Sequence, residues 1–249
     1  MDARREMKLI AAQILPVPGE YEENIAKHVD LIHMAAGQGA NLVLFPELSL
    51  TGYQPGLAEA LAVDPSDSRL DEFQRLSDRY GMLIAVGAPT RGAKGTEISM
   101  ISFQPGLERT SYSKQYLHAE ELPFFTPGTR RLVLRQADVV LAPAICYESL
   151  QPRHAEEAAE SGAQVYLASV AKSERGTASA NRHYPMIAKK HSMTVVMANC
   201  VGPADDFVAA GCSAVWNSQG ERVCSADAVQ EALVAYDIKT GDASIIKLA

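Results

Sequence analysis

The chain has 249 residues, 47% of them apolar, and a formal net charge of −7. This length and composition fit one large globular domain and exclude a disordered or fibrous chain. The negative charge forms no block, so it argues against nucleic acid or an anionic membrane as a partner and leaves small molecules open. No apolar run approaches the roughly eighteen residues of a membrane-spanning helix, so we expect a soluble protein.

Further sequence features bear on the location of the protein, on metal binding and on its domain organisation. Four cysteines without a compact framework favour reduced thiols in a chain of this size, and therefore a cytoplasmic location. Six histidines lack the H-x-H and H-E-x-x-H spacings, so we expect no metal site. We interpret residues 1–7 as a polar leader and residues 1–249 as a single domain without a linker or an internal repeat.

The first half of the chain alternates between apolar residues at helical spacing and short continuous apolar runs typical of strands. Ile25, Val29 and Ile32 recur at three- and four-residue spacing and predict a helix, whereas the run 41–45 is a strand of the kind buried on both faces. In order, we expect a strand at 8–15, a helix from 21 to 37, a strand at 41–45, a loop at 51–56, a helix over 70–80, a strand at 82–86 and a hairpin of 98–103 with 109–112.

The second half continues this alternation after a proline- and glycine-bearing loop over 114–128. We expect strands at 132–134 and 139–145, a helix at 151–161, a strand at 165–170, a helix at 179–192, a strand at 194–198, and short strands at 212–216, 221–225 and 232–237. Alternating strands and helices with added hairpins predict an α/β fold built as a layered sandwich.

Three reactive side chains directly follow predicted strands: Glu47, Lys114 and Cys146. The end of a buried strand is where α/β folds place their chemistry. A cysteine nucleophile needs a base, and a carboxylate serves when burial raises its pKa towards neutrality. A lysine nearby stabilises a thiolate or an oxyanion, and the backbone N–H of Tyr147 is the natural second oxyanion donor. These groups could perform nucleophilic catalysis without histidine.

Three stretches also carry a resemblance to a known family. They read Phe45-Pro46-Glu47-Leu48-Ser49-Leu50-Thr51-Gly52-Tyr53, Tyr112-Ser113-Lys114 and Ile145-Cys146-Tyr147-Glu148. In this order, each around a predicted strand end, they resemble the three signatures of the nitrilase superfamily, the carbon–nitrogen hydrolases. The resemblance spans essentially the whole chain. It implies a four-layer α-β-β-α sandwich that commonly forms a homodimer or a higher homo-oligomer.

The same resemblance implies the roles of the reactive residues. Glu47 would be the general base, Lys114 the lysine that stabilises the oxyanion, and Cys146 the nucleophile. A second glutamate is expected in the loop after the lysine, and its spacing from the following proline selects Glu121 rather than its neighbour Glu120. The implied reaction passes through a cysteine thioester and needs no metal or organic cofactor.

Four further residues are candidates for substrate binding: Tyr53, Tyr147, Glu148 and Ala171. The two tyrosines could equally pack in the interior, and Glu148 could equally be a charge favoured at a helix start. The segment after the nucleophile departs from the family's common Cys-Tyr-Asp-x-Arg-Phe-Pro-Glu, since it reads Cys-Tyr-Glu-Ser-Leu-Gln-Pro-Arg over 146–153. This departure leaves the subfamily and the substrate open.

We therefore expect a hydrolase of non-peptide carbon–nitrogen bonds, an amidase that acts on a small amide or N-carbamoyl compound. A true nitrilase is one alternative. Another is a catalytically silent homologue that binds a metabolite or a partner protein. A third is a Cys–His hydrolase, because His154 follows Cys146 closely in the sequence, although a helix would carry it away.

Overall fold

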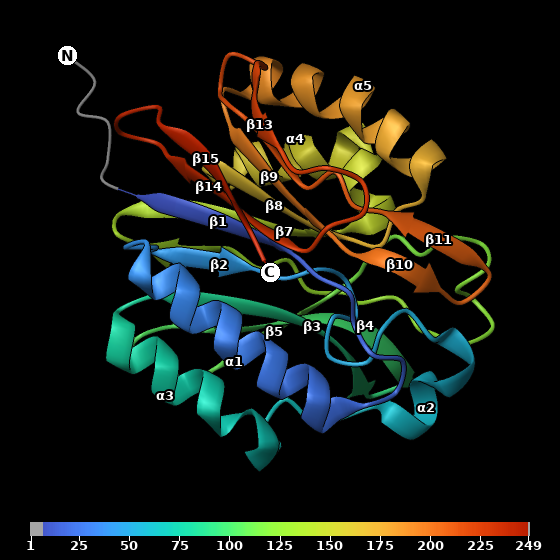
Figure 1. Cartoon of the computed structure of the whole chain (residues 1–249). Coiled ribbons are helices and arrows are strands. Elements are labelled where there is room, and N and C mark those ends of the chain that lie inside the picture. The colour runs from blue at the N-terminus through green and yellow to red at the C-terminus, as the bar shows by residue number, and fades with distance from the viewer. Residues whose placement is uncertain (1–6, 249) are drawn as a thin grey trace.

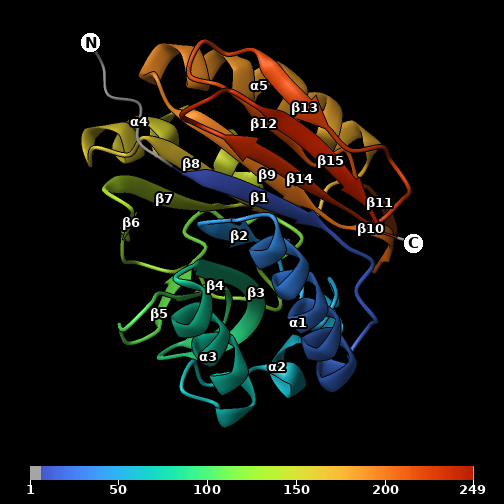
Figure 2. The same cartoon turned by 60° about the vertical axis from the view of Figure 1, so that its left-hand side comes forward.

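Two β-sheets lie face to face, and a pair of helices covers the outer face of each sheet (Figure 1). The computed structural model describes residues 7–248, so the predicted leader lies outside the described residues except for Met7. On one side the helices are α1 (Tyr21–Gly37) and α3 (Asp71–Tyr80). On the other side they are α4 (Pro152–Glu160) and α5 (Glu174–His191), as Figure 2 also shows. The predicted α-β-β-α sandwich is confirmed.

The first sheet has seven strands in the order β15-β14-β1-β2-β3-β4-β5. Strands β1, β2 and β3 are parallel, whereas β4 and the flanking β14 and β15 join the sheet through antiparallel pairs. The strands are β1 (Lys8–Gln13), β2 (Leu42–Leu44), β3 (Leu83–Gly92), β4 (Gly95–Phe103), β5 (Thr110–Ser113), β14 (Ala232–Asp237) and β15 (Ala243–Lys247).

The second sheet has six strands in the order β13-β12-β9-β8-β7-β6, with β7, β8 and β9 parallel. A separate hairpin of β10 and β11 follows β9 in the chain. The strands are β6 (Leu134–Gln136), β7 (Val139–Ile145), β8 (Val165–Val170), β9 (Thr194–Asn199), β10 (Val201–Ala204), β11 (Phe207–Ala210), β12 (Ala214–Trp216) and β13 (Arg222–Ser225).

Strand β1 shows why the central strands have apolar side chains on both faces. Successive side chains of a strand point to opposite faces. Leu9 and Ala11 pack in the core between the two sheets, whereas Ile10 and Ala12 pack in the core under α1 and α3. A third core lies between the second sheet and helices α4 and α5. Each fully buried leucine or isoleucine contributes about 1.5–3 kcal/mol, so these layers carry much of the fold's stability.

Several element boundaries differ from the predictions. Helix α5 begins at Glu174 rather than 179, because the Ser173 side chain accepts a hydrogen bond from Gly176 N–H and caps a first turn that includes two poor helix formers, Gly176 and Thr177. Strand β3 runs on to Gly92 and pairs with β4. The predicted loop at 51–56 leads into a 3₁₀ turn (Pro55–Leu57) and the short helix α2 (Ala58–Leu61), and the predicted strand at 132–134 lies at 134–136.

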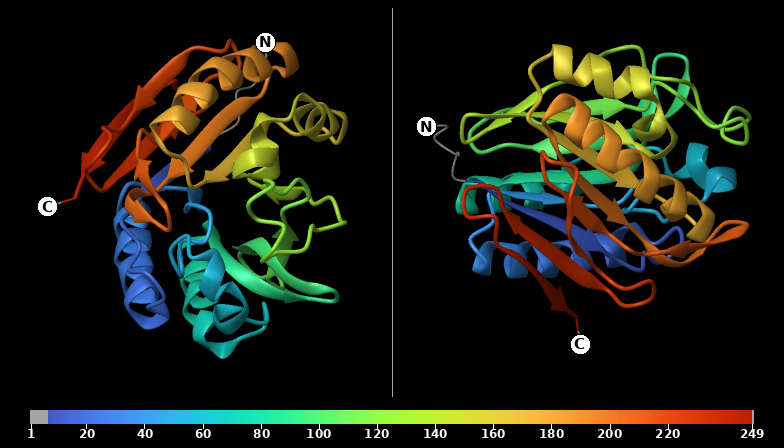
Figure 3. Two further views of the ribbon diagram at one scale, coloured as in Figure 1. Left: turned by 90° about the vertical axis from the view of Figure 1, so that its right-hand side faces the viewer. Right: turned by 90° about the horizontal axis from the view of Figure 1, so that it is seen from above.

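Three strands were not predicted at all. Strands β10 and β11 form a short hairpin around Asp205 and Asp206, which by sequence are turn residues rather than strand residues. Strand β15 lies at the edge of the first sheet (Figure 3). Its side chains are mostly exposed, so it lacks the apolar pattern of the central strands. None of the helices formed by residues 7–248 is both long and apolar enough to cross a membrane.

A side-chain hydrogen bond ties the two sheets together close to their strand ends. Ser169 in β8 donates from its hydroxyl to the backbone oxygen of Phe45, directly after β2, at 2.8 Å. Both residues are buried. A hydrogen bond between buried groups is strong, so this one helps to fix the second sheet relative to the end of β2. Glu47 lies only two residues beyond Phe45.

Candidate active site

Glu47, Lys114 and Cys146 all lie just after strand ends, and the topology brings these ends together. Strands β2 and β3 are parallel to each other. Strand β5 also runs in the direction of β3, because β4 is antiparallel to both β3 and β5. Strands β2 and β5 therefore end at the same edge of the first sheet. Cys146 follows β7 directly in the opposite sheet. Glu47 is 2% exposed and Lys114 is fully buried, whereas Cys146 is partly exposed.

Lys114 forms two buried ion pairs. Its Nζ atom lies 2.7 Å from Glu47 Oε1 and 2.6 Å from Glu121 Oε1. Two carboxylates around one ammonium leave a net negative charge in a region without exposed side chains. Buried charges persist only when they are paired and hydrogen-bonded, so the three residues form one interdependent unit.

The Glu121 carboxylate is fully occupied by hydrogen bonds. Oε1 also accepts from the Tyr53 hydroxyl at 3.1 Å, and Oε2 accepts from His118 N–H at 2.7 Å. The neighbouring Glu120 side chain is 83% exposed and lies near the His118 ring. The structure therefore places Glu121, and not Glu120, against Lys114.

The electrostatics of the three strand-end residues suit proton transfer. Burial raises the pKa of Glu47, although Lys114 opposes this shift. Burial alone would lower the pKa of the Lys114 ammonium. Electrostatic interaction with Glu47, Cys146 and Glu121 has the larger effect, so the pKa of Lys114 is raised. Burial and then Glu47 raise the pKa of the Cys146 thiol to about 11, so the resting sulfur is protonated. Glu47 Oε2 is buried and has no hydrogen-bond partner within residues 7–248.

The turns that carry Glu47 and Cys146 are strained. Leu48, directly after Glu47, has φ 52°, and Cys146 itself has φ 45°. Each such non-glycine conformation costs about 1–3 kcal/mol and persists where the surroundings enforce it. Gly87 in β3 packs against the Glu47 turn so closely that a Cβ atom would lie 2.3 Å from the Pro46 oxygen. The backbone of this turn therefore packs directly against Gly87, a position that has no room for a side chain.

A cleft of about 550 Å³ opens over Cys146. Three of the four candidate binding residues, Tyr53, Tyr147 and Ala171, line it. The Cys146 thiol donates to the Ala171 oxygen across 3.6 Å, and the Tyr147 side chain is 38% exposed. The remaining lining residues come from the loop after Lys114, the turn that begins at Cys146, the segment from the end of β8 into helix α5, and the β10–β11 hairpin: His118, Glu120, Glu121, Leu150, Lys172, Ser173, Arg175, Gly176, Ser179, Asp206 and Phe207.

Glu148 does not line this cleft and is fully buried behind it. Its Oε1 accepts from Ile145 N–H at 2.7 Å and from the Tyr112 hydroxyl at 2.8 Å. Its Oε2 accepts from Gln115 N–H at 2.7 Å and from Tyr116 N–H at 3.3 Å. Burial raises the pKa of Glu148 to about 7, against these hydrogen bonds. The carboxylate thus joins the turn of Cys146 to the loop that follows Lys114.

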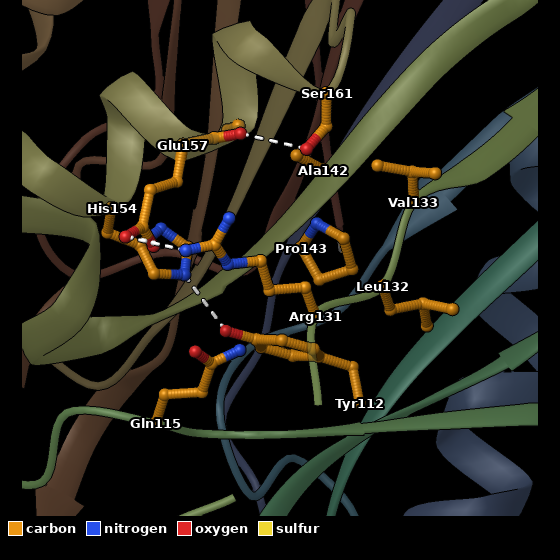
Figure 4. Close-up of a pocket in the computed structure, with 11 residues that line it drawn as sticks. Tyr112, Gln115, Arg131, Leu132, Val133, Ala142, Pro143, His154, Glu157 and Ser161 are labelled. Carbon is orange, nitrogen blue, oxygen red and sulfur yellow. Dashed lines mark hydrogen bonds and ion pairs between the residues drawn. The ribbon is translucent and has the colours of Figure 1, made fainter. Parts of the chain in front are cut away.

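His154 lies on the far side of Glu148 from this cleft. Its ring hydrogen-bonds to the Tyr112 hydroxyl at 2.9 Å and to the Tyr166 hydroxyl at 2.7 Å, and burial lowers its pKa to about 4. It borders a separate hollow of about 20 Å³, enough for about one water molecule (Figure 4). Both ring nitrogens of His154 are thus engaged by tyrosines, and no hydrogen bond joins the ring to Cys146.

Lys172 is a site residue that the sequence analysis did not identify. It lies two residues after β8, and its Nζ atom is 3.8 Å from Cys146 Sγ and 3.4 Å from the Cys146 oxygen. The lysine is 5% exposed. Like Glu47, Lys114 and Cys146, it is a reactive side chain shortly after a predicted strand, so it carried the same local signal. Among residues 7–248, no three His, Cys, Asp or Glu side chains gather so that they could hold a metal ion.

Comparison with known proteins decides the family. Residues 9–246 match the carbon-nitrogen hydrolase family. The chain belongs to this family. Among solved structures, this carbon–nitrogen hydrolase is similar to the amidase from Nesterenkonia sp. AN1, in the complex of a cysteine-to-alanine mutant with butyramide. The TM-score is 0.85 at 25% identity, with 94% of this chain and 91% of that chain covered.

Curated relatives of this carbon–nitrogen hydrolase have several activities. A glutamine-dependent NAD(+) synthetase from Thermotoga maritima is 24% identical over 94% of this chain and 42% of its own length. A probable nitrilase from Schizosaccharomyces pombe is 24% identical over 96% of this chain and 91% of its own length. The chain spans less than half the length of the synthetases that it matches, 42–48%.

Proposed function

We propose that this carbon–nitrogen hydrolase is an amidase that hydrolyses a small amide or N-carbamoyl compound through a cysteine thioester. One observation carries the proposal. The partly exposed residue Cys146 lines a cleft beside the buried Glu47–Lys114–Glu121 cluster, in which Glu47 Oε2 has no hydrogen-bond partner among residues 7–248. A nucleophile, an acceptor for its proton and a cation for the developing oxyanion are the groups that acyl transfer requires.

In the acylation half-reaction, Cys146 Sγ attacks the amide carbon and its proton passes to Glu47. The raised pKa of the Glu47 carboxyl suits this role, because a base with a pKa nearer neutrality both accepts and returns a proton efficiently. The oxyanion receives hydrogen bonds from Lys114 and from Tyr147 N–H. Collapse of the tetrahedral intermediate breaks the C–N bond, and Glu47 protonates the departing ammonia or amine.

In the deacylation half-reaction, Glu47 removes a proton from water, which attacks the thioester carbon. The C–S bond then breaks, and the sulfur recovers its proton from Glu47. Glu121 hydrogen-bonds to Lys114 and Tyr53 and so holds the lysine in place. The reaction consumes one amide and one water and needs no cofactor.

The structural relative supports this choice of reaction. One structure of the Nesterenkonia amidase shows covalent addition of the acetamide moiety of fluoroacetamide at the active site cysteine, and another holds butyramide. The chain described here shares that fold with similar coverage of both proteins. An amide of a few carbons also fits a cleft of about 550 Å³.

The test is ammonia release from aliphatic amides, ω-amides, N-carbamoyl amines and nitriles, with Cys146→Ala as the control. We expect turnover of amides or N-carbamoyl compounds that is lost in the variant. Turnover of nitriles alone would favour a true nitrilase. No turnover in any class, with a folded protein whose Cys146 resists alkylation, would favour a silent binding protein.

We also propose a cytoplasmic homodimer or higher homo-oligomer. The four cysteines are free, which suits a reducing compartment. The quaternary state rests on the resemblance to the nitrilase superfamily. Light scattering coupled to size-exclusion chromatography tests it, and a mass of one chain at micromolar concentration would contradict it.

A further inference from the structure

Lys172 presents a buried ammonium to the cleft, and no carboxylate among residues 7–248 forms an ion pair with it. The side chain is 5% exposed, and its Nζ atom contacts only the Cys146 oxygen at 3.4 Å and Cys146 Sγ at 3.8 Å among residues 7–248. Lys114 provides the contrast, because two carboxylates lie within 2.7 Å of its Nζ atom. The two lysines next to Cys146 thus differ in whether their charge is already neutralised.

Neighbouring residues position Lys172 so that its ammonium lies next to Cys146. The buried Asn199 binds the lysine backbone on both sides, since its Oδ1 accepts from Lys172 N–H at 2.8 Å and its Nδ2 donates to the Lys172 oxygen at 3.1 Å. Gly176 in α5 leaves room for the stem: a Cβ atom there would lie 3.0 Å from Lys172 Cβ and 3.3 Å from Lys172 Cγ. The ammonium is therefore part of a built site and not a mobile surface charge.

The net negative charge of the Lys114 cluster acts on this ammonium without a direct ion pair, so the ammonium is incompletely compensated and a bound anion would relieve the cost of its burial. Cys146 does not supply that anion at rest, because burial raises its thiol pKa to about 11. Arg175, exposed on the rim of the same cleft, adds a second positive charge. Three acidic residues line the cleft. Glu121 accepts hydrogen bonds from Lys114, Tyr53 and His118, whereas Glu120 and Asp206 are exposed and no hydrogen bond or ion pair joins them to Lys172.

We propose that Lys172 binds a carboxylate on the acyl side of the substrate, so that the preferred substrates are monoamides of short dicarboxylic acids. This inference rests on the proposed amide hydrolysis and adds the substrate class. Lys172 Nζ lies 3.8 Å from the sulfur that attacks the amide carbon, so the two ends of the acyl group lie close together. One or two methylene groups, as in malonamate and succinamate, fit this separation. Hydrolysis of succinamate gives succinate and ammonia, with water as the only co-reactant.

Matched substrates test this assignment. Succinamate and butyramide have the same chain length and differ by a carboxylate in place of a methyl group. We expect wild type to have a higher kcat/KM for succinamate. In Lys172→Met the ratio of the two kcat/KM values should fall about 10- to 100-fold, the loss expected for one hydrogen bond to a charged group. In Arg175→Met, which removes an exposed cation of the same cleft, the ratio should fall by much less.

Alkylation of Cys146 tests the same contact without hydrolysis. Iodoacetate and iodoacetamide react at the same carbon, but only iodoacetate carries a carboxylate beside it. We expect the ratio of the iodoacetate rate to the iodoacetamide rate to be higher for folded wild type than for free cysteine, and to fall in Lys172→Met. This readout remains valid if every amide fails as a substrate, so failure of the proposed function and failure of this inference are distinguishable.

Three outcomes would overturn the inference. Wild type could prefer butyramide and react with iodoacetate no faster, relative to iodoacetamide, than free cysteine does. Lys172→Met could lower both kcat/KM values equally, which would make the lysine a stabiliser of the thiolate instead. Arg175→Met could lower the ratio as much as Lys172→Met, which would indicate general attraction by the cleft and not a specific contact. Because wild type alone provides the first comparison, the test holds even if Lys172→Met does not fold.

Discussion

Lys114 Nζ donates to Glu47 Oε1 at 2.7 Å, and this contact joins the end of β5 to the end of β2 in a region where both side chains are inaccessible to water. It occupies one oxygen of the Glu47 carboxylate and leaves the other, Oε2, without a partner among the described residues. The pairing therefore orients the carboxylate and at the same time leaves it an acceptor site. In the proposed mechanism that site receives the proton of Cys146.

Loss of the Lys114 ammonium should destabilise the protein strongly. Lys114→Met leaves Glu47 and Glu121 buried without a counter-charge, and breaking a buried pair in this way costs about 3–5 kcal/mol. Urea denaturation measures the free energy of unfolding. The matched control is Lys27→Met, which breaks a partly exposed pair with Glu231 of 3.0 Å and should cost about 0–1 kcal/mol. Equal losses in the two variants would contradict a buried ionic cluster.

The same variant should have a characteristic pH dependence. Burial raises the pKa of Glu47, and Lys114 partly offsets this shift. Without Lys114 the pKa of Glu47 should therefore be higher still. A raised folded-state pKa means that protonation favours the folded state, so stability is lost as the pH rises through that pKa. The stability deficit of Lys114→Met should thus shrink towards about pH 5. A deficit that grows on acidification would show that the carboxylates are not the cause.

Replacement of the Glu47 carboxylate should remove activity and preserve the fold. Glu47→Gln keeps an oxygen for Lys114 but cannot accept the proton of a thiol whose pKa is about 11. Loss of a general base lowers kcat by about 10²–10⁴-fold. Ammonia release and thermal denaturation, measured on one preparation, separate the two effects. Activity within a few-fold of wild type would rule out Glu47 as the base.

The packing of Gly87 under the Glu47 turn predicts a steric effect on the site. A Cβ atom at Gly87 would lie 2.3 Å from the Pro46 oxygen and 2.4 Å from Leu48 N, both backbone atoms that cannot move without displacing Glu47. Gly87→Ala should cost about 1–3 kcal/mol of stability and most of the activity. Gly56→Ala is the control, since a Cβ atom there has no neighbour within 4 Å. If both variants remain fully active, the position of Glu47 does not depend on this contact.

The reactivity of Cys146 should keep rising with pH well beyond that of an ordinary thiol. Burial and Glu47 raise its pKa to about 11, so the thiolate fraction at neutral pH is small and increases until the pH reaches that value. The rate of alkylation by iodoacetamide, followed by mass spectrometry of the Cys146 peptide, measures this. A plateau already below about pH 7 would indicate a permanent thiolate held by Lys172 or Lys114, and Glu47 would then not be needed as a base for attack.

The layers and the strand-end residues were predictable because they depend on local patterns. Strands such as β7 and β8 are apolar at nearly every position, since both faces are buried, and such runs can be recognised without knowledge of their partners. Glu47, Lys114 and Cys146 stand directly after such runs or after a hairpin strand, within motifs that resemble a family. Their mutual contacts could not be derived, because these depend on which strands are neighbours in the two sheets.

The contacts of Lys172 and Glu148 depend on tertiary structure that a local pattern does not contain. Lys172 follows a buried strand, but its approach to Cys146 depends on the parallel pairing of β7 with β8, which the sequence pattern does not determine. Glu148 was a candidate for substrate contact, yet the structure turns its carboxylate towards backbone N–H groups of two different segments. Such hydrogen bonds between distant parts of the chain have no periodicity by which they could be recognised.

Interception of the acyl-enzyme tests the central claim most directly. Hydroxylamine attacks a thioester and converts its acyl group to a hydroxamate, so wild type supplied with butyramide and hydroxylamine should form butyrohydroxamate together with ammonia. Cys146→Ala should form neither product, while its thermal denaturation remains like that of wild type. Ammonia release that persists in Cys146→Ala, or that continues in wild type without any hydroxamate as the hydroxylamine concentration is raised, would contradict a thioester on Cys146.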